Sequence, residues 1–118
     1  MLIDYTKKTR KELDEIRDDY LTSIEHIVKD SPTFRLLSYA IASTHAETFK
    51  RTILGAVLGR DFTDNGEIDY QQVPTDKLEE LRTKYRIYLL SEDFSFEFRV
   101  WFQDMHNAVK EEIFRRKT

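Results

Sequence analysis

The stretch that decides the fold is residues 31–59, which reads SPTFRLLSYAIASTHAETFKRTILGAVLG. A serine followed by a proline is a typical helix start, because Ser31 can cap the first turn and Pro32 has the backbone angle of a first helical position. Apolar side chains then recur every three or four residues, and Gly59 is a typical stop. The stretch therefore predicts a helix over residues 32–58.

The residues before this stretch predict another amphipathic helix, over about residues 5–29. Leu13 and Ile16 begin an apolar stripe that continues to Ile27 at helical spacing, and the opposite side is rich in charged residues. Several alanines in the 32–58 segment allow a neighbouring helix to approach closely. We therefore expect the two segments to pack as an antiparallel hairpin.

A polar loop and a third helix come next. Residues 61–73 are the only long polar interruption of the chain, and they predict an irregular or hairpin loop. Pro74 then introduces a helix, because proline is tolerated at a helix start. Asp76 and Glu79 have the spacing of a capping box. Ser91 marks the point at which this helix breaks or a new one begins.

The last segment, residues 94–114, fits two patterns. Between Phe94 and Phe102 the apolar residues alternate with other residues, which is typical of a strand. Apolar residues also recur at helical spacing, and only this second series continues to Ile113. The helix-forming residues after Phe102 favour a helix, and such a helix is apolar on two sides over its first half.

Composition limits both the fold and the class of function. The 118 residues include three glycines, two prolines and no cysteine, and the net charge is −3. The lack of cysteine excludes a disulfide scaffold, a zinc ribbon and a thiol nucleophile. The charge provides no overall attraction to nucleic acid or to an anionic membrane. We therefore expect one all-α domain over residues 1–118, a small bundle of three to four helices, located in the cytoplasm and bound to no membrane.

The aromatic residues of the last helix predict a protein-interaction surface. A helix that is apolar on two sides needs cover on both, and aromatic side chains provide much of the energy at protein interfaces. The leading hypothesis is a non-enzymatic regulatory protein that binds a protein partner or a second copy of itself. Small inhibitor and immunity proteins have a similar size and charge, and the hypothesis follows this analogy. The alternative is that these aromatic residues form the core. The predicted interface residues are Phe94, Phe96, Phe98, Val100, Trp101 and Phe102.

A second hypothesis is a helical subunit that associates with nucleic acid. Basic side chains occur along the 32–58 helix and just beyond it, and such cations bind phosphate groups. No helix-turn-helix boundary accompanies them. The residues of this alternative surface are Arg35, Lys50, Arg51 and Arg60.

Residues 61–72, DFTDNGEIDYQQ, resemble the twelve-residue calcium loop of the EF-hand family. The resemblance implies a calcium ion bound by Asp61, Asn65 and Asp69, with Gly66 at the sharp turn. The same residues also fit a short hairpin turn in which Gly66 adopts the left-handed conformation. A calcium-binding module is therefore a third hypothesis.

No sequence motif predicts catalysis or a cofactor. The chain contains no glycine-rich phosphate loop and no Gly-x-Ser-x-Gly elbow. Its three histidines, His26, His45 and His106, lack a second ligand at the spacing that metal sites on helices use. We therefore expect no enzyme activity, no cofactor and no metal site outside the 61–72 loop.

Overall fold

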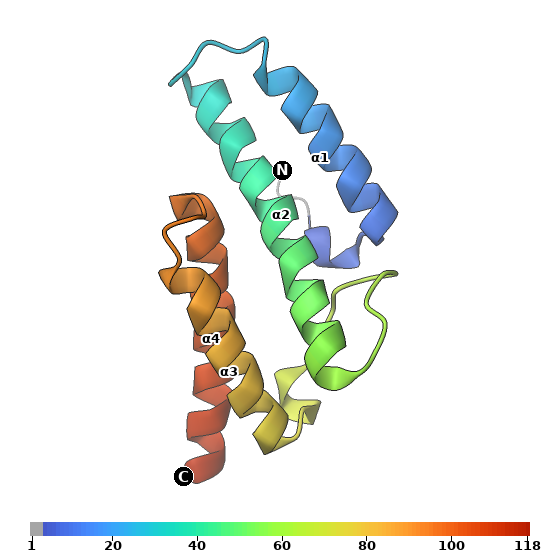
Figure 1. Cartoon of the computed structure of the whole chain (residues 1–118), viewed down its shortest axis with the longest axis vertical. Coiled ribbons are helices and arrows are strands. Elements are labelled where there is room, and N and C mark those ends of the chain that lie inside the picture. The colour runs from blue at the N-terminus through green and yellow to red at the C-terminus, as the bar shows by residue number, and fades with distance from the viewer. Residues whose placement is uncertain (1–3) are drawn as a thin grey trace.

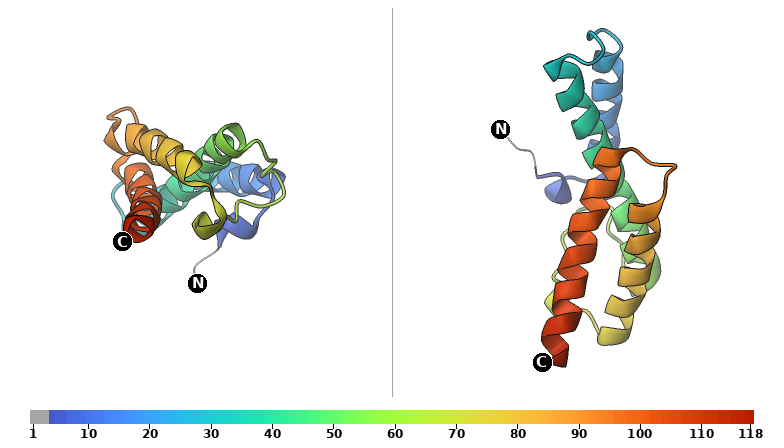
Figure 2. Two further views of the ribbon diagram at one scale, coloured as in Figure 1. Left: turned by 90° about the horizontal axis from the view of Figure 1, so that it is seen from below. Right: turned by 90° about the vertical axis from the view of Figure 1, so that its left-hand side faces the viewer.

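The computed structural model describes residues 4–118, which form four α-helices in an elongated arrangement (Figure 1). Helices α1 (Arg10–Ile24) and α2 (Pro32–Leu58) form an antiparallel hairpin. Helices α3 (Thr75–Leu90) and α4 (Phe96–Lys117) form a second antiparallel pair, which packs against α2 (Figures 1 and 2). Residues 4–118 contain no strand, so the prediction of an all-α bundle is confirmed.

Helix α2 begins and ends at the residues that the sequence predicts. The Ser31 hydroxyl accepts a hydrogen bond from the Phe34 N–H at 3.1 Å, and Pro32 is the first helical residue. At the other end Gly59 adopts the left-handed conformation, with a φ of 69° that glycine reaches without a steric penalty. These two local signals fix the central helix, which contacts each of the other three helices.

Helix α1 is shorter than the sequence predicts, because it spans Arg10–Ile24 instead of residues 5–29. Its start is fixed by a reciprocal capping box. The Thr9 hydroxyl accepts a hydrogen bond from the Glu12 N–H, and the Glu12 carboxylate accepts one from the Thr9 N–H. The residues before this cap form a separate 3-10 turn, Tyr5–Lys7.

Helix α3 begins without the predicted capping box. Pro74 occupies the N-cap position and provides no side-chain hydrogen bond, so Asp76 lies inside the first turn. A carboxylate at this place still interacts favourably with the helix dipole, although it caps no backbone N–H. The helix ends at Leu90, directly before Ser91, where the sequence predicts a break. A 3-10 turn, Tyr70–Gln72, precedes it.

The last segment forms helix α4, and the alternating apolar pattern within it does not form a strand. The helix starts at Phe96, two residues later than predicted, because the Ser95 hydroxyl caps it by accepting a hydrogen bond from the Phe98 N–H at 3.2 Å. Three basic residues lie in its last turn, where they complement the helix dipole.

The core lies where α3 and α4 pack against the C-terminal half of α2. Its largest fully buried side chains include Leu54, Tyr85, Phe98 and Phe102. Aromatic rings contact one another within it. The centroids of Phe98 and Phe102 are 5.0 Å apart, and those of Tyr85 and Phe102 are 5.7 Å apart. Phe98 and Phe102 of α4 therefore serve as core residues.

The other half of the α1–α2 hairpin extends beyond α3 and α4 (Figures 1 and 2). We call residues 14–41 the distal arm. None of its side chains is fully buried, and Val28 and Leu36 are 77% and 72% exposed. The arm gives the molecule its length of 50 Å against a width of 27 Å.

Candidate functional site

The structure divides the six predicted interface residues between core and surface. Phe98 and Phe102 are 2% and 0% exposed and belong to the core cluster. The half-buried members are Phe94, Val100 and Trp101. Phe96 is exposed, at 70%. Because Phe98 and Phe102 contact α2 and α3 of the same chain, they do not face a partner, and Phe96 is the member best placed to do so.

Two of the four basic residues proposed for nucleic-acid binding are buried in ion pairs. Lys50 Nζ lies 2.7 Å from Glu47 Oε1, and Arg51 Nε lies 2.8 Å from Glu47 Oε2. All three side chains are less than one-tenth exposed. Burial lowers the pKa of Lys50, and the Glu47 carboxylate opposes that effect by favouring the charged ammonium. Arg35 and Arg60 are exposed, so the four residues do not form one basic surface.

Arg51 also holds the N-terminal segment against α2. Its Nη2 donates hydrogen bonds to three backbone carbonyls, those of Tyr5, Thr6 and Lys8. The Gly66 N–H donates a further hydrogen bond to the Thr6 carbonyl at 2.7 Å, which joins the 61–72 loop to the same segment. This Arg51 network, centred on one buried guanidinium, connects three parts of the chain that are distant in sequence.

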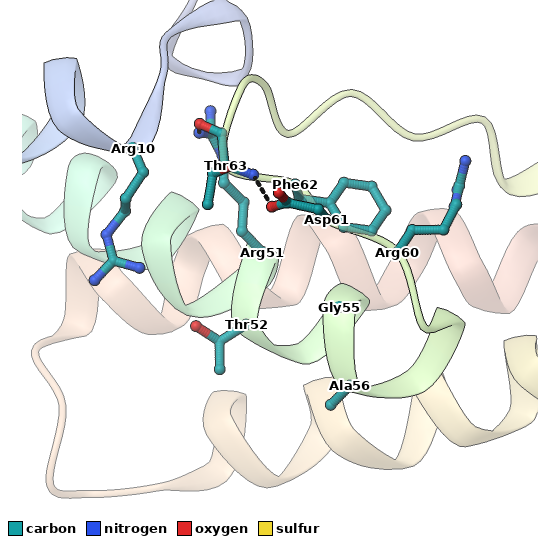
Figure 3. Close-up of a pocket in the computed structure, with 9 residues that line it drawn as sticks. All are labelled: Arg10, Arg51, Thr52, Gly55, Ala56, Arg60, Asp61, Phe62 and Thr63. Carbon is teal, nitrogen blue, oxygen red and sulfur yellow. Dashed lines mark hydrogen bonds between the residues drawn. The ribbon is translucent and has the colours of Figure 1, made fainter.

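A cavity of about 210 Å³ beside this network has three arginines in its wall (Figure 3). Arg10 and Arg60 lie at opposite ends of it, and Arg51 lies between them. Each guanidinium already has a partner: Arg10 pairs with Asp14, Arg51 binds Glu47 and the carbonyls, and Arg60 stacks over the Phe62 ring at 5.1 Å. The arginines therefore do not converge on a common anion.

The three predicted calcium ligands of the 61–72 loop take part in local hydrogen bonds. Each of the three side chains accepts a hydrogen bond from the backbone N–H two residues later, and these side chains are Asp61, Asn65 and Asp69. Side-chain oxygens used in this way form local turns. Within residues 4–118, no group of three or more His, Asp or Glu side chains could hold a metal ion, and this includes the three histidines. The structure shows these three side chains in local turns, and calcium binding by the loop stays a prediction.

Gly66 has a different role from either of those that the sequence suggests. It does not adopt the left-handed conformation, since Gly59 is the glycine with a positive φ in the described part of the chain. A Cβ at Gly66 would overlap the Glu47 carboxylate and would lie 2.7 Å from Arg51 Nε. Glycine is needed here because the loop backbone closely approaches a buried ion pair. The hairpin that the sequence offered as an alternative does not form in residues 61–73.

A basic groove lies between α3 and α4 on their exposed side. It has a volume of about 380 Å³, and the residues that line it are Arg82, Asn107, Lys110, Glu111, Ile113, Phe114 and Lys117. Arg82 Nη2 pairs with Glu79 Oε2 at 2.7 Å. Lys110 and Lys117 form no ion pair with any residue of the described chain, and the Phe114 ring is 69% exposed. The groove thus combines unpaired cations with an exposed aromatic ring.

His106 shows the excess of positive charge near this groove. Burial lowers the pKa of His106, and the nearby cations Lys110, Arg82 and Arg86 lower it further. The Nδ1 atom of His106 is buried and has no hydrogen-bond partner in the described structure. A negative charge placed in the groove would offset the repulsion that these cations exert on one another and on the imidazolium form.

Further exposed apolar side chains lie nearer the α3–α4 turn than the basic groove does. Because the two helices are antiparallel, the end of α3 lies beside the start of α4 (Figure 2). Ile87 and Leu90 are 59% and 62% exposed there, and Phe96 follows on α4. We use the name outer face for the groove residues together with the exposed residues of α3 and α4 near it: Arg82, Arg86, Ile87, Leu90, Phe96, Lys110, Phe114 and Lys117.

Sequence reasoning missed most of the outer face. The spacing of Lys110, Phe114 and Lys117 on one side of a helix was an available signal, because residues three and four apart share a helix surface. No sequence signal pairs these residues with Arg82, which belongs to another helix. The contact between α3 and α4 creates the groove.

Comparisons with protein-family models, with curated proteins and with solved structures found no match to this chain. Within residues 4–118, no helix combines the length and the hydropathy that crossing a bilayer requires.

Proposed function

We propose that this chain is a non-enzymatic binding protein whose outer face docks an acidic, apolar segment of a partner protein. The observation that carries this proposal is the basic groove, in which Lys110 and Lys117 are unpaired beside the exposed Phe114 ring. We further propose that this binding protein has a regulatory role and acts in the cytoplasm, as its composition suggests.

The charge of the outer face supports an acidic partner. Arg86, Lys110 and Lys117 have no ion-pair partner among residues 4–118, and the acidic residue on the groove wall is Glu111. Complementary charge across an interface accelerates association and selects the correct partner. Carboxylates of a partner would provide the negative charge that this surface lacks.

The apolar residues of the outer face support a protein partner rather than a nucleic acid. Ile87, Leu90, Phe96 and Phe114 are each more than half exposed. Burying one such side chain contributes about 1.5–3 kcal/mol, and an amphipathic helix in a groove between two helices buries several at once. Phosphate groups would pair with the cations but would leave this apolar surface in water.

The proposal is tested with a labelled helical peptide that carries leucines on one face and glutamates beside them. Fluorescence anisotropy should show saturable binding to the wild-type chain, and weaker binding of a peptide with the same composition in scrambled order. Lys110→Glu should weaken binding of the amphipathic peptide by about tenfold or more, because it replaces a favourable charge with an unfavourable one.

The matched control is Lys84→Glu, the same change of charge at an exposed position of α3 outside the basic groove. Equal losses from Lys110→Glu and Lys84→Glu would contradict docking in the groove. Binding of a DNA duplex in preference to the peptide would contradict the choice of a protein partner. Circular dichroism of both variants establishes that they remain folded.

A further inference from the structure

A second cavity, of about 650 Å³, lies where the 61–72 loop meets α4, and Lys50 of α2 forms part of its wall. It is separate from the outer face, since the two share no lining residue. Apolar side chains make up one side of the cavity, and these are Ile68, Tyr70, Trp101 and Met105. Two aromatic rings and a thioether therefore border a single space.

Three carboxylates border the same cavity. Glu67 and Asp69 come from the loop and Asp104 comes from α4, and all three residues are exposed. None of them forms an ion pair with a residue of the described chain. Asp69 accepts one hydrogen bond, from the Gln71 N–H at 3.0 Å. The rim of the cavity therefore carries negative charge that this chain does not neutralise.

Lys50 provides unused hydrogen-bond donors at the cavity wall. Its side chain is 6% exposed, and its charge is offset by Glu47 at 2.7 Å. Within residues 4–118 its Nζ donates one hydrogen bond, to Glu47, although an ammonium group has three N–H groups to donate. A ligand acceptor that reached this ammonium group would form a charge-assisted hydrogen bond with it.

We propose that this cavity binds an organic cation, an alkylammonium group on a small body that also carries a hydrogen-bond acceptor. The ammonium group would lie against the Trp101 and Tyr70 rings and the rim carboxylates, because aromatic faces attract cations and do so most strongly for quaternary ammonium groups. The acceptor, a hydroxyl or a carbonyl, would meet the Lys50 donors. The cation is either a free small molecule or a lysine side chain of a peptide, because the two share this chemistry.

The experiment uses the full chain and the fluorescence of Trp101, its only tryptophan. Choline is the first probe, and 3,3-dimethylbutanol, which has the same shape without the charge, is its control. A second pair is an acetylated, amidated Ala-Lys-Ala peptide and its norleucine counterpart. We expect a saturable change in Trp101 emission with choline or with the lysine peptide, and a much weaker one with each neutral compound. The tighter of the two cations identifies the source of the ligand.

Variants connect the response to the cavity. Asp104→Asn should weaken binding of the cation by about tenfold, because it removes one carboxylate from the rim. Asp93→Asn, in the exposed turn before α4, is the matched control and should bind as the wild type does. The inference is overturned if neither cation changes the emission, if the neutral compounds act equally, or if both variants weaken binding to the same degree. The outer face takes no part in this test, so its outcome is independent of the proposed partner docking.

Discussion

Gly66 and Glu47 show how one backbone position depends on a buried charge. The carboxylate of Glu47 pairs with both Lys50 and Arg51, and the Gly66 backbone lies directly against it. A buried ion pair costs desolvation energy, and it is maintained only when every member keeps its partners. Because Gly66 has no side chain, the loop can pack directly over the Glu47, Lys50 and Arg51 side chains.

Gly66→Ala should therefore lower the free energy of unfolding by about 1–3 kcal/mol, because the added methyl group overpacks the site and displaces Glu47 from Arg51. Chemical denaturation monitored by circular dichroism measures the change. Gly55→Ala, within α2, is the control. Its new methyl group would lie 3.2 Å from the Arg60 carbonyl oxygen, a tight contact but a far milder one than at Gly66, and alanine favours the helix. A Gly66→Ala variant as stable as Gly55→Ala would contradict the close approach.

Two histidines with lowered pKa values, His45 and His106, predict a loss of stability below neutral pH. Burial lowers the pKa of His45 and of His106 from the ordinary value of 6.5. Below that value the unfolded chain binds protons that the folded chain does not, so the free energy of unfolding falls as the pH falls. Each such histidine contributes a slope of up to about 1.4 kcal/mol per pH unit.

His106→Gln should make this slope shallower between about pH 7.5 and 5.5, a window that lies above the pKa of most carboxylates. Denaturation at a series of pH values measures it. His26→Gln replaces an exposed histidine in the loop after α1 and is the matched control. An equal change of slope in both variants would show that burial of His106 is not the cause.

At the scale of elements, the distal arm is the least stabilised part of the hairpin. Its two helical segments pack on each other, and α3 and α4 cover mainly the other half of α2 (Figure 1). Within the arm, the Tyr39 ring lies 6.1 Å from the Trp101 ring of α4. Residues 14–41 contain no fully buried side chain, whereas the C-terminal half of α2 contributes Ile53, Leu54 and Val57 to the core. Regions with few buried contacts open by local unfolding more readily.

Native-state hydrogen exchange should therefore be faster in the distal arm than in α3, α4 and residues 44–58. We expect protection factors lower by about tenfold or more, since local opening there exposes little buried surface. Mass spectrometry of peptic peptides resolves the two halves of α2. Equal protection along the whole of α2 would show that the arm is stabilised by contacts beyond those described.

At the scale of the whole molecule, the arrangement is more extended than a compact chain of this length. The Cα radius of gyration is 15.3 Å, while a compact domain of 118 residues has about 13.5 Å. The distal arm accounts for this difference, because it projects past the core (Figure 2). The shape leaves the outer face and the second cavity accessible at different places on the surface.

Small-angle X-ray scattering with light scattering should show an elongated monomer whose radius of gyration clearly exceeds about 13.5 Å. A value near the compact limit would mean that the arm folds back over the core. A mass twice that of the chain would mean that the exposed apolar faces bind a second copy of this chain instead of a different protein.

The sequence by itself determined the helices and the places where the central one begins and ends. Ser31, Pro32 and Gly59 act on their own turns, through caps and backbone angles that need no distant residue. The start of α1 at Arg10 was also predictable from a local signal, the Thr9–Glu12 capping box, although the periodicity of the apolar residues pointed to an earlier start. Local interactions can be predicted from sequence because both partners are near in the chain.

The tertiary structure alone decided which of these helix surfaces are buried and which are free to bind. Periodicity places Phe98, Lys50 and Lys110 on helices, but it does not say which face meets a neighbouring helix. Contacts between distant segments put Phe98 in the core, pair Lys50 with a buried carboxylate, and set Lys110 across a groove from Arg82. A binding surface combines residues from several helices, so it exists only once those helices have packed.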